Sequence, residues 1–180
     1  GLVGAGLLTL RQAIGIIMGA NIGTTITTFI IGFNITHYAL PILFLGAACL
    51  FFVRHNFINN LGRILFGFGG IFFALTLMSG AMEPLKYLPA FTDLTVKLSH
   101  QPILGVFIGT IITMLVQASS ATISILQNVY QENLITLKAA LPVLFGDNIG
   151  TTITAIIAVI GANTSAKRLA LSHTMFNVIG

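Results

Sequence analysis

The stretch Gly19-Ala-Asn-Ile-Gly-Thr-Thr-Ile-Thr27 returns almost unchanged as Gly146-Asp-Asn-Ile-Gly-Thr-Thr-Ile-Thr154, with eight of nine positions identical. Both copies lie inside strongly apolar segments. A polar, glycine-containing stretch is costly in a membrane unless it is buried in protein or lines a cavity. Matching interruptions in two halves of a chain indicate the binding site of a transporter.

The similarity continues upstream of both motifs. Leu7-Leu-Thr-Leu-Arg-Gln-Ala13 aligns with Leu134-Ile-Thr-Leu-Lys-Ala-Ala140, which keeps Thr, Leu, a basic residue and Ala in register. The chain therefore contains two copies of one structural unit.

Composition restricts the class of protein. Hydrophobic residues make up 56% of the chain, charged residues 7%, and the mean hydropathy is +0.99. Soluble domains carry roughly a quarter charged residues, so only a membrane protein fits. The net charge of +4 is small and scattered, which argues against nucleic-acid binding. No nucleophile–base pair, phosphate loop or zinc spacing is present in the sequence, so we expect neither an enzyme nor a cofactor.

Three parts are expected along the chain. Residues 1–82 hold the C-terminal part of a first repeat and the helices that follow it, and 83–101 form an interfacial amphipathic connection. Residues 102–180 form a second repeat. Because the chain starts without methionine at Gly1 and ends in an apolar run at Gly180, we expect a piece of a longer protein.

The second repeat is predicted to begin with a re-entrant hairpin at 102–130. Each arm has about 15 residues and spans roughly 22 Å, which is short of a bilayer core of about 30 Å. A broken helix at 134–160 and a truncated helix at 169–180 complete the repeat. The predicted fold is an all-α membrane protein with inverted-topology repeats.

Charge placement predicts the topology, because basic residues concentrate on the cytoplasmic side. With that rule, the segment 13–31 runs outward and 134–160 runs inward, as an inverted repeat requires. The basic residues placed inside are Arg11, Arg54, Arg63, Lys167 and Arg168.

The two motifs carry neutral side-chain donors and acceptors. An unwound turn at each glycine would free backbone carbonyls for a hard cation such as sodium, and the half-helix that follows would suit an anion. Asp147 replaces Ala20 and is the only acid within a predicted span. It is either a cation ligand or a hydrated group close to the interface.

These motifs resemble the type II sodium-dependent phosphate cotransporters, especially the bacterial branch. That family pairs Gln-Ser-Ser-Ser on a re-entrant hairpin with Gly-x-Asn-Ile-Gly-Thr downstream, once in each repeat. Gln117-Ala-Ser-Ser120 and Gly146-Asp-Asn-Ile-Gly-Thr151 match the second repeat, whereas Gly19-Ala-Asn-Ile-Gly-Thr24 alone represents the first. Ala118 departs from the family's first serine and removes one hydroxyl ligand.

The resemblance implies sodium-coupled symport of inorganic phosphate by alternating access in a multi-pass bacterial inner-membrane protein. Sodium ions are the coupling ions, the lipid bilayer is a further partner, and no nucleic acid is expected. A homodimer and a soluble regulatory domain outside the chain stay open. The implied ligands of phosphate and sodium are Gln117, Ser119, Ser120 and Thr122 from the hairpin, Asn21, Thr24 and Thr25 from the first motif, and Asn148, Thr151 and Thr152 from the second.

Two alternatives remain at this stage. Broken helices bind any small anion through backbone dipoles, so another oxyanion or a small carboxylate is an alternative substrate. The other is a non-transporting membrane protein that senses phosphate.

Overall fold

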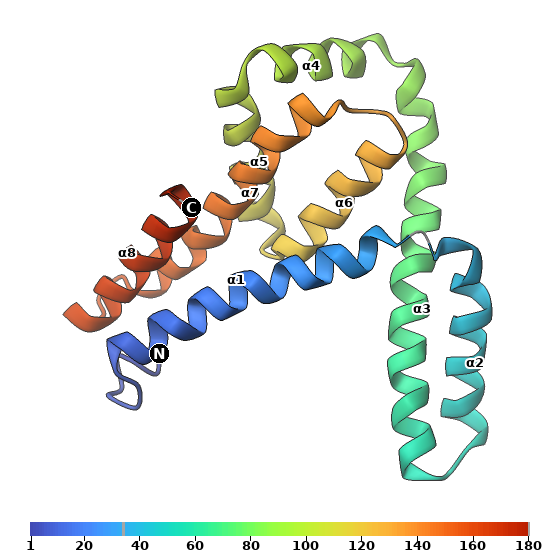
Figure 1. Cartoon of the computed structure of the whole chain (residues 1–180), viewed down its shortest axis with the longest axis horizontal. Coiled ribbons are helices and arrows are strands. Elements are labelled where there is room, and N and C mark those ends of the chain that lie inside the picture. The colour runs from blue at the N-terminus through green and yellow to red at the C-terminus, as the bar shows by residue number, and fades with distance from the viewer. Residues whose placement is uncertain (34, 180) are drawn as a thin grey trace. The chain divides into compact units, whose positions relative to one another are not determined.

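The computed structural model describes residues 1–33 and 35–179. Gly180, the last residue of the predicted helix 169–180, lies outside them. All regular secondary structure in the described residues is helical (Figure 1). The chain divides into two compact units, one comprising Gly1–Ile30 with Leu88–Gly180 and the other Ile31–Tyr87. The prediction of an all-α protein is confirmed.

The first unit contains most of the helices. Their bounds are α1 Leu10–Gly32, α4 Pro89–His100, α5 Pro102–Val116, α6 Ser119–Gln131, α7 Leu137–Ala158 and α8 Thr164–Ile179.

Three helices in the described residues are long and apolar enough to cross a membrane, namely α1, Asn56–Tyr87 and α7. The shorter α2, Ala39–Phe52, has 14 residues. At 1.5 Å per residue it spans roughly 21 Å, less than a bilayer core. The composition and these helices together define an all-α membrane protein.

The repeated threonine upstream of each motif caps a helix. The Thr9 hydroxyl lies 2.8 Å from Oε1 of Gln12, and Gln12 Oε1 also accepts from the Thr9 backbone N–H at 3.0 Å. Thr136 Oγ1 accepts from the backbone N–H of Ala139 at 3.3 Å. A side chain that satisfies free N–H groups fixes where a helix begins. The upstream similarity therefore encodes matching starts for α1 and α7.

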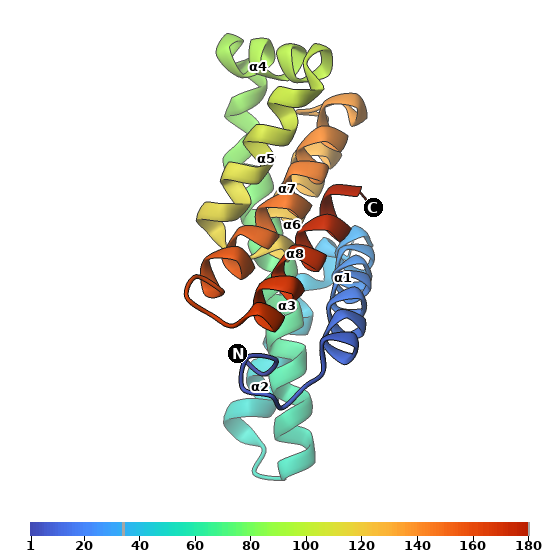
Figure 2. The ribbon, with the colours of Figure 1, turned by 90° about the vertical axis from the view of Figure 1, so that its left-hand side faces the viewer.

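The packing of α5 on α7 forms the centre of the first unit (Figure 2). Small residues bring the two backbones together. A Cβ added at Gly105 would lie 2.7 Å from the Cβ of Pro142, and one at Gly146 would overlap the carbonyl oxygen of Val106. Interfaces of small residues are typical of membrane helices, where close backbone approach gives the packing energy.

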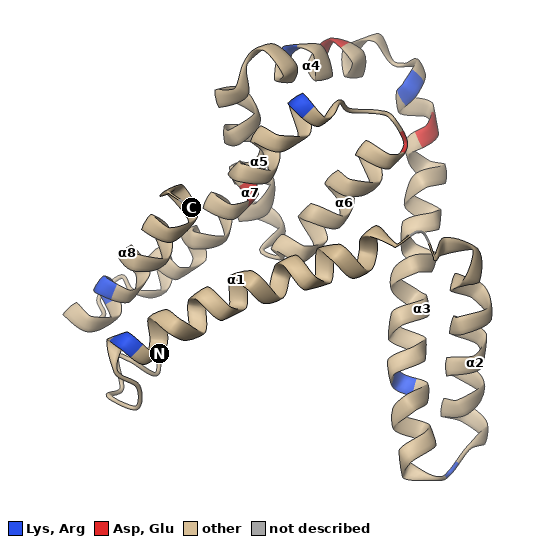
Figure 3. Ribbon diagram, viewed as in Figure 1, with Lys and Arg blue, Asp and Glu red and all other residues tan. Residues whose placement is uncertain are grey.

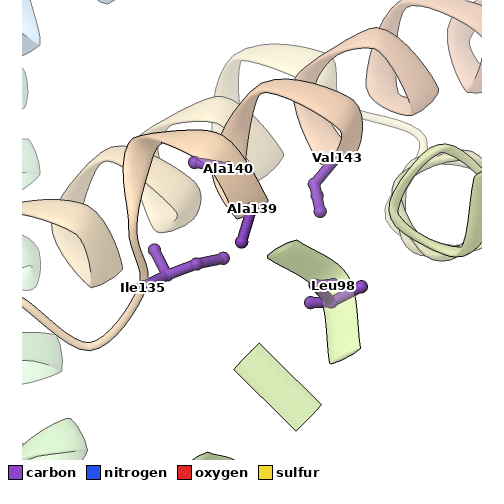
Figure 4. Packing of buried hydrophobic residues seen from close by; sticks show 5 residues of the cluster. All are labelled: Leu98, Ile135, Ala139, Ala140 and Val143. Carbon is purple, nitrogen blue, oxygen red and sulfur yellow. The ribbon is translucent and has the colours of Figure 1, made fainter. Parts of the chain in front are cut away.

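A hydrophobic cluster closes one end of this helix pair (Figure 4). Leu98 comes from α4, and its partners come from the start of α7 and the turn before it. These partners are Ile135, Ala139, Ala140 and Val143.

The predicted amphipathic connection contains a helix, α4, which meets α5 at a bend of 115°. Pro102 begins α5, and the residue before a proline is kept out of the helical conformation. Gln101, between the two helices, has φ −124° and ψ 80°. The bend therefore has a local cause in the sequence.

The predicted hairpin at 102–130 is present as α5 and α6. Its turn lies at Gln117, which has φ 55° in the left-handed region, followed by the extended Ala118. A non-glycine residue in this conformation costs of order 1 kcal/mol or more. Such strain tends to occur at functional sites.

The predicted breaks in the two motif helices are not observed, and this expectation was wrong. Both α1 and α7 continue through their motifs, and neither Gly23 nor Gly150 has a positive φ. The motif threonines donate to backbone carbonyls three or four residues earlier, as Thr24 does to Ala20 at 3.2 Å and Thr151 to Asn148 at 2.6 Å. These bonds are compatible with a continuous helix and leave its backbone ladder closed.

The two motif helices run in opposite directions. Asn163, after α7, donates from Nδ2 to the carbonyl of Gly4, before α1, at 3.0 Å. Thr28, late in α1, shares a groove with Leu137 at the start of α7. The start of one helix therefore lies near the end of the other, and an inverted crossing of a membrane stays a prediction.

The second unit is a helical hairpin of α2 and α3, the latter Asn56–Met82, flanked by the 3₁₀ segments Thr36–Tyr38 and Glu83–Tyr87. Glycines again allow close approach, since a Cβ at Gly69 would lie 2.6 Å from the Leu43 nitrogen. Its core is Ala39, Phe72 and Leu75.

Candidate functional site

A polar cavity of about 180 Å³ lies within the first unit. Three elements line it: α1, the start of α6, and α7. Both copies of the repeated motif contribute, so their antiparallel helices face a common space. The lining residues are Asn21, Thr24, Thr25, Thr28, Ser119, Ile123, Leu144, Asn148 and Thr151.

The first motif presents one face of α1 to the cavity. Asn21, Thr24, Thr25 and Thr28 are spaced by three, four and seven residues, the spacing of one helical face. Thr25 donates its hydroxyl to the Asn21 carbonyl at 3.3 Å, and Thr28 donates to the Thr24 carbonyl at 3.1 Å. Each hydroxyl oxygen keeps lone pairs that can accept from a ligand or bind a cation.

Asn21 also carries an unsatisfied donor. Its Nδ2 is buried and has no hydrogen-bond partner among the described residues. A buried donor without a partner costs roughly 1–3 kcal/mol. An anion in the adjacent cavity would supply the missing acceptor.

The hairpin brings a helix N-terminus to the same cavity. Ser119 is the first residue of α6 and lines the cavity. The first bonds within α6 run from the N–H groups of Ala121 and Thr122 to the Ala118 carbonyl. Because the N–H groups before them have no such bond, this terminus carries positive partial charge suited to an anion.

The structure brings together six of the ten predicted site residues and separates four. Gln117 and Ser120 are exposed at the hairpin turn and do not line the cavity. Thr122 and Thr152 are buried, with 4% and 1% exposure, and bond to the carbonyls of Ala118 and Ile149. The six that line the cavity are Asn21, Thr24, Thr25, Ser119, Asn148 and Thr151.

The second motif has two differently used faces. Asn148 and Thr151 line the cavity, whereas Asp147 and Gly150 pack on α5. Asp147 is completely buried and accepts from the Thr113 hydroxyl at 2.5 Å. Its side chain has no exposed surface in this structure, and its depth in a membrane stays a prediction.

Three lining residues were not predicted from the sequence. Thr28 follows Thr24 by one helical turn and extends the polar face of α1. Ile123 and Leu144 are apolar, and nothing distinguishes them from other core residues in the sequence. All three also line an adjoining apolar groove of about 150 Å³ that reaches Tyr130 and Leu137.

The site contains no formal charge. None of the nine lining residues is acidic or basic. In the first unit, Arg11 and Lys138 lie near the first turns of the two motif helices, and α5 and α6 carry no charged residue (Figure 3). Neutral hydroxyls and amides can bind a small ion and release it again, since no fixed opposite charge holds it.

Both repeated polar motifs thus line one uncharged cavity in an all-α membrane protein. The Na+/Pi-cotransporter family matches residues 1–80 and 87–180, and the chain belongs to that family. The resemblance inferred from the motifs is thereby confirmed.

Several proteins are similar to this chain. The uncharacterized protein YqeW of Bacillus subtilis is 33% identical over 180 residues, covering 100% of this chain and 58% of that protein. The putative inorganic phosphate export protein YjbB of Escherichia coli K12 is 25% identical over 174 residues, covering 97% of this chain and 32% of that protein. Human sodium-dependent phosphate transport protein 2B is 33% identical over 132 residues, covering 67% of this chain and 19% of that protein.

The chain thus spans about three fifths of the length of the first of these relatives and about a third of the second. No solved structure matches the chain.

Proposed function

We propose that this chain forms part of a membrane transporter that moves inorganic phosphate together with sodium ions. The observation that carries this proposal is the cavity in which both repeated motifs meet. Family membership and the names of the relatives YjbB and transport protein 2B support phosphate as the substrate. The protein would act without a cofactor and without enzymatic chemistry.

The site suits an oxyanion on one side. Asn21 offers a buried amide donor, and the start of α6 at Ser119 offers backbone donors with a positive dipole end. Phosphate would accept from these groups near the hairpin, and Ser119 would add its hydroxyl.

Sodium would bind beside the phosphate. The hydroxyls of Thr24, Thr25 and Thr151 already donate to backbone carbonyls, so their oxygens face a ligand as acceptors. Oxygen ligands are those that a hard cation prefers. Gln117, Ser120 and Thr122 would reach the ions only after a rearrangement of the hairpin, whereas Thr152 is buried in α7 and would stay outside the site.

The antiparallel course of α1 and α7 supports alternating access. Inverted repeats exchange conformations around a fixed site, which opens it to each side in turn. In the proposed setting, a bacterial inner membrane, the ends of α1 and α7 near Arg11 and Lys167 face the cytoplasm.

Uptake of radiolabelled phosphate into proteoliposomes holding the full-length parent protein tests the proposal. We expect uptake to require an inward sodium gradient and to fail with potassium. Competition by sulfate and arsenate separates phosphate from other oxyanions. Phosphate uptake that does not depend on sodium would contradict the proposed sodium coupling.

A matched pair of variants tests the site. Thr24 lines the cavity, whereas Thr27 makes a similar backbone bond at 3.4 Å on an exposed face. Thr24→Ala should weaken sodium-coupled phosphate uptake roughly tenfold or more, about 1.4 kcal/mol, because it removes an oxygen ligand of the proposed sodium ion. Thr27→Ala should leave it unchanged. Equal effects of the two substitutions would refute the assignment.

A phosphate-sensing membrane protein is the competing function. It predicts phosphate binding to the purified protein without flux in the same vesicles.

A further inference from the structure

An apolar groove of about 150 Å³ adjoins the polar cavity. Thr28, Ile123 and Leu144 line both spaces, which therefore meet at these side chains. The groove lies within the first unit, and none of the residues that line it is charged. A ligand held in the cavity thus has beside it a second space of different polarity.

One face of α6 and one face of α7 form the walls of the groove. On α6 the lining residues are Ile123 and those three, four and seven positions after it, and on α7 they are Leu144 and those three, four and seven positions before it. This spacing belongs to a single helical face. Seven residues of a helix span roughly 10 Å, so the groove extends away from the cavity as far as Tyr130 and Leu137.

The groove has the size and the lining for one aromatic ring. An apolar cavity of about 150 Å³ in a protein interior binds benzene. Five of the nine lining residues are leucine or isoleucine, and a sixth is alanine. Leu137 and Leu141 are half-exposed, so the groove is open to an entering ring on the side of α7. Transfer of an aromatic ring from water to such surroundings is favourable.

The ring would reach the groove from a phosphorus atom in the cavity. The donors proposed for phosphate are the Asn21 amide and the start of α6 at Ser119, and both residues line the cavity. Ile123 follows Ser119 by about one helical turn, so the groove begins directly beside the expected position of the anion. A phosphonate keeps three oxygens for the donors, and the fourth substituent of its phosphorus is free to lie in the groove.

We propose that this site also binds phosphonates that carry one aromatic ring, with the phosphonate group in the cavity and the ring in the groove between α6 and α7. This deepens the proposed function, on which it rests, because the cavity is taken as the phosphate site. Such compounds compete with phosphate for the same donors, and the groove sets which substituent on phosphorus the site prefers.

Calorimetric titration of the purified full-length parent protein in sodium chloride compares phosphate, methylphosphonate and phenylphosphonate, at a pH at which the two phosphonates carry the same charge. The two phosphonates differ only in the group that would lie in the groove. We expect phenylphosphonate to bind roughly tenfold more tightly than methylphosphonate, since even one methylene group in a hydrophobic pocket changes binding by about tenfold or more. Equal affinities would overturn the proposal, and they would be the result if lipid or another part of the parent protein filled the groove.

A matched pair of variants assigns the preference to the groove. Leu141 lines the groove but not the cavity, whereas the exposed Leu171 on α8 lines neither. In Leu141→Trp the larger side chain takes the place of the ring, so the affinity for phenylphosphonate should fall to that for methylphosphonate, while the affinity for phosphate stays unchanged. Leu171→Trp should keep the preference for the ring. A preference that persists in Leu141→Trp would show that the ring lies elsewhere and would overturn the proposal.

The titration with phosphate also shows whether each variant is folded. If Leu141→Trp does not bind phosphate, Leu126→Trp on the α6 wall of the groove replaces it. A wild-type protein that binds phosphate and does not prefer the ring would refute the groove alone. A wild-type protein that binds none of the three ligands would refute the phosphate site, and the ring site with it.

Discussion

Gly146→Ala is the substitution whose effect the structure determines most directly. The added Cβ would overlap the Val106 carbonyl oxygen and lie 2.8 Å from the Thr110 nitrogen. Both are backbone atoms of α5, so rotation of a side chain cannot relieve the contact. The helices must separate, although alanine is the better helix former by about 1 kcal/mol.

The loss of stability in this variant follows from the contacts that are broken when α5 and α7 separate. Overpacking a close contact costs roughly 1–3 kcal/mol. Separation also stretches the bonds from Thr110 to Gly146 and from Thr113 to Asp147, and interhelical hydrogen bonds in membranes contribute on average about 0.6 kcal/mol each. After the gain of about 1 kcal/mol in helix propensity is subtracted, we expect a loss of about 1–3 kcal/mol in the free energy of unfolding.

Gly19→Ala is the matched control. Gly19 holds the same position in the first motif, and a Cβ there meets nothing within 4 Å in this structure. In the 180-residue chain in detergent it should be neutral or slightly stabilising. Titration with SDS, followed by ellipticity, gives both values. Equal stabilities of the two variants would refute the backbone contact between α5 and α7.

Two further predictions concern the site and its hairpin. Thr151→Val should weaken phosphate binding by the full-length protein roughly tenfold, about 1.4 kcal/mol, whereas Thr152→Val should leave it unchanged, because only Thr151 lines the cavity. Calorimetric titration compares the two variants. Equal losses of affinity would contradict the assignment of Thr151 and Thr152 to different faces of α7. Ala118→Ser should supply the missing side-chain cap of α6, which contributes about 1 kcal/mol, and should raise the Tm by roughly 2–4 °C. An unchanged Tm would show that the serine makes no cap.

Much of the fold was predictable from sequence periodicity and composition. The hairpin at 102–130 followed from the charge placement, which puts both of its ends on one side of the membrane, and the structure has its turn at Gln117. The matching helix starts at Thr9 and Thr136 were visible as a repeated threonine, although their role as caps required the hydrogen bonds. Local features such as these depend on neighbours in the sequence.

The broken helices were predicted wrongly for a specific reason. Glycine and threonine lower helix propensity by up to about 1 kcal/mol, which suggests unwinding at Asn-Ile-Gly-Thr-Thr. In the structure the threonine hydroxyls bond to carbonyls of the same helix, and Gly150 is held by α5. Packing of α7 against the neighbouring helix therefore favours a continuous helix where helix propensity alone suggested unwinding.

The sequence by itself determined that this is an all-α membrane protein built from two copies of a polar motif, since composition and repetition need no neighbours to be recognised. Only the tertiary structure decided which motif residues act together. Adjacent residues of a helix point about 100° apart, so Asn148 faces the cavity while Asp147 faces α5. Which of these directions meets an open cavity and which meets a partner helix depends on segments far away in the chain.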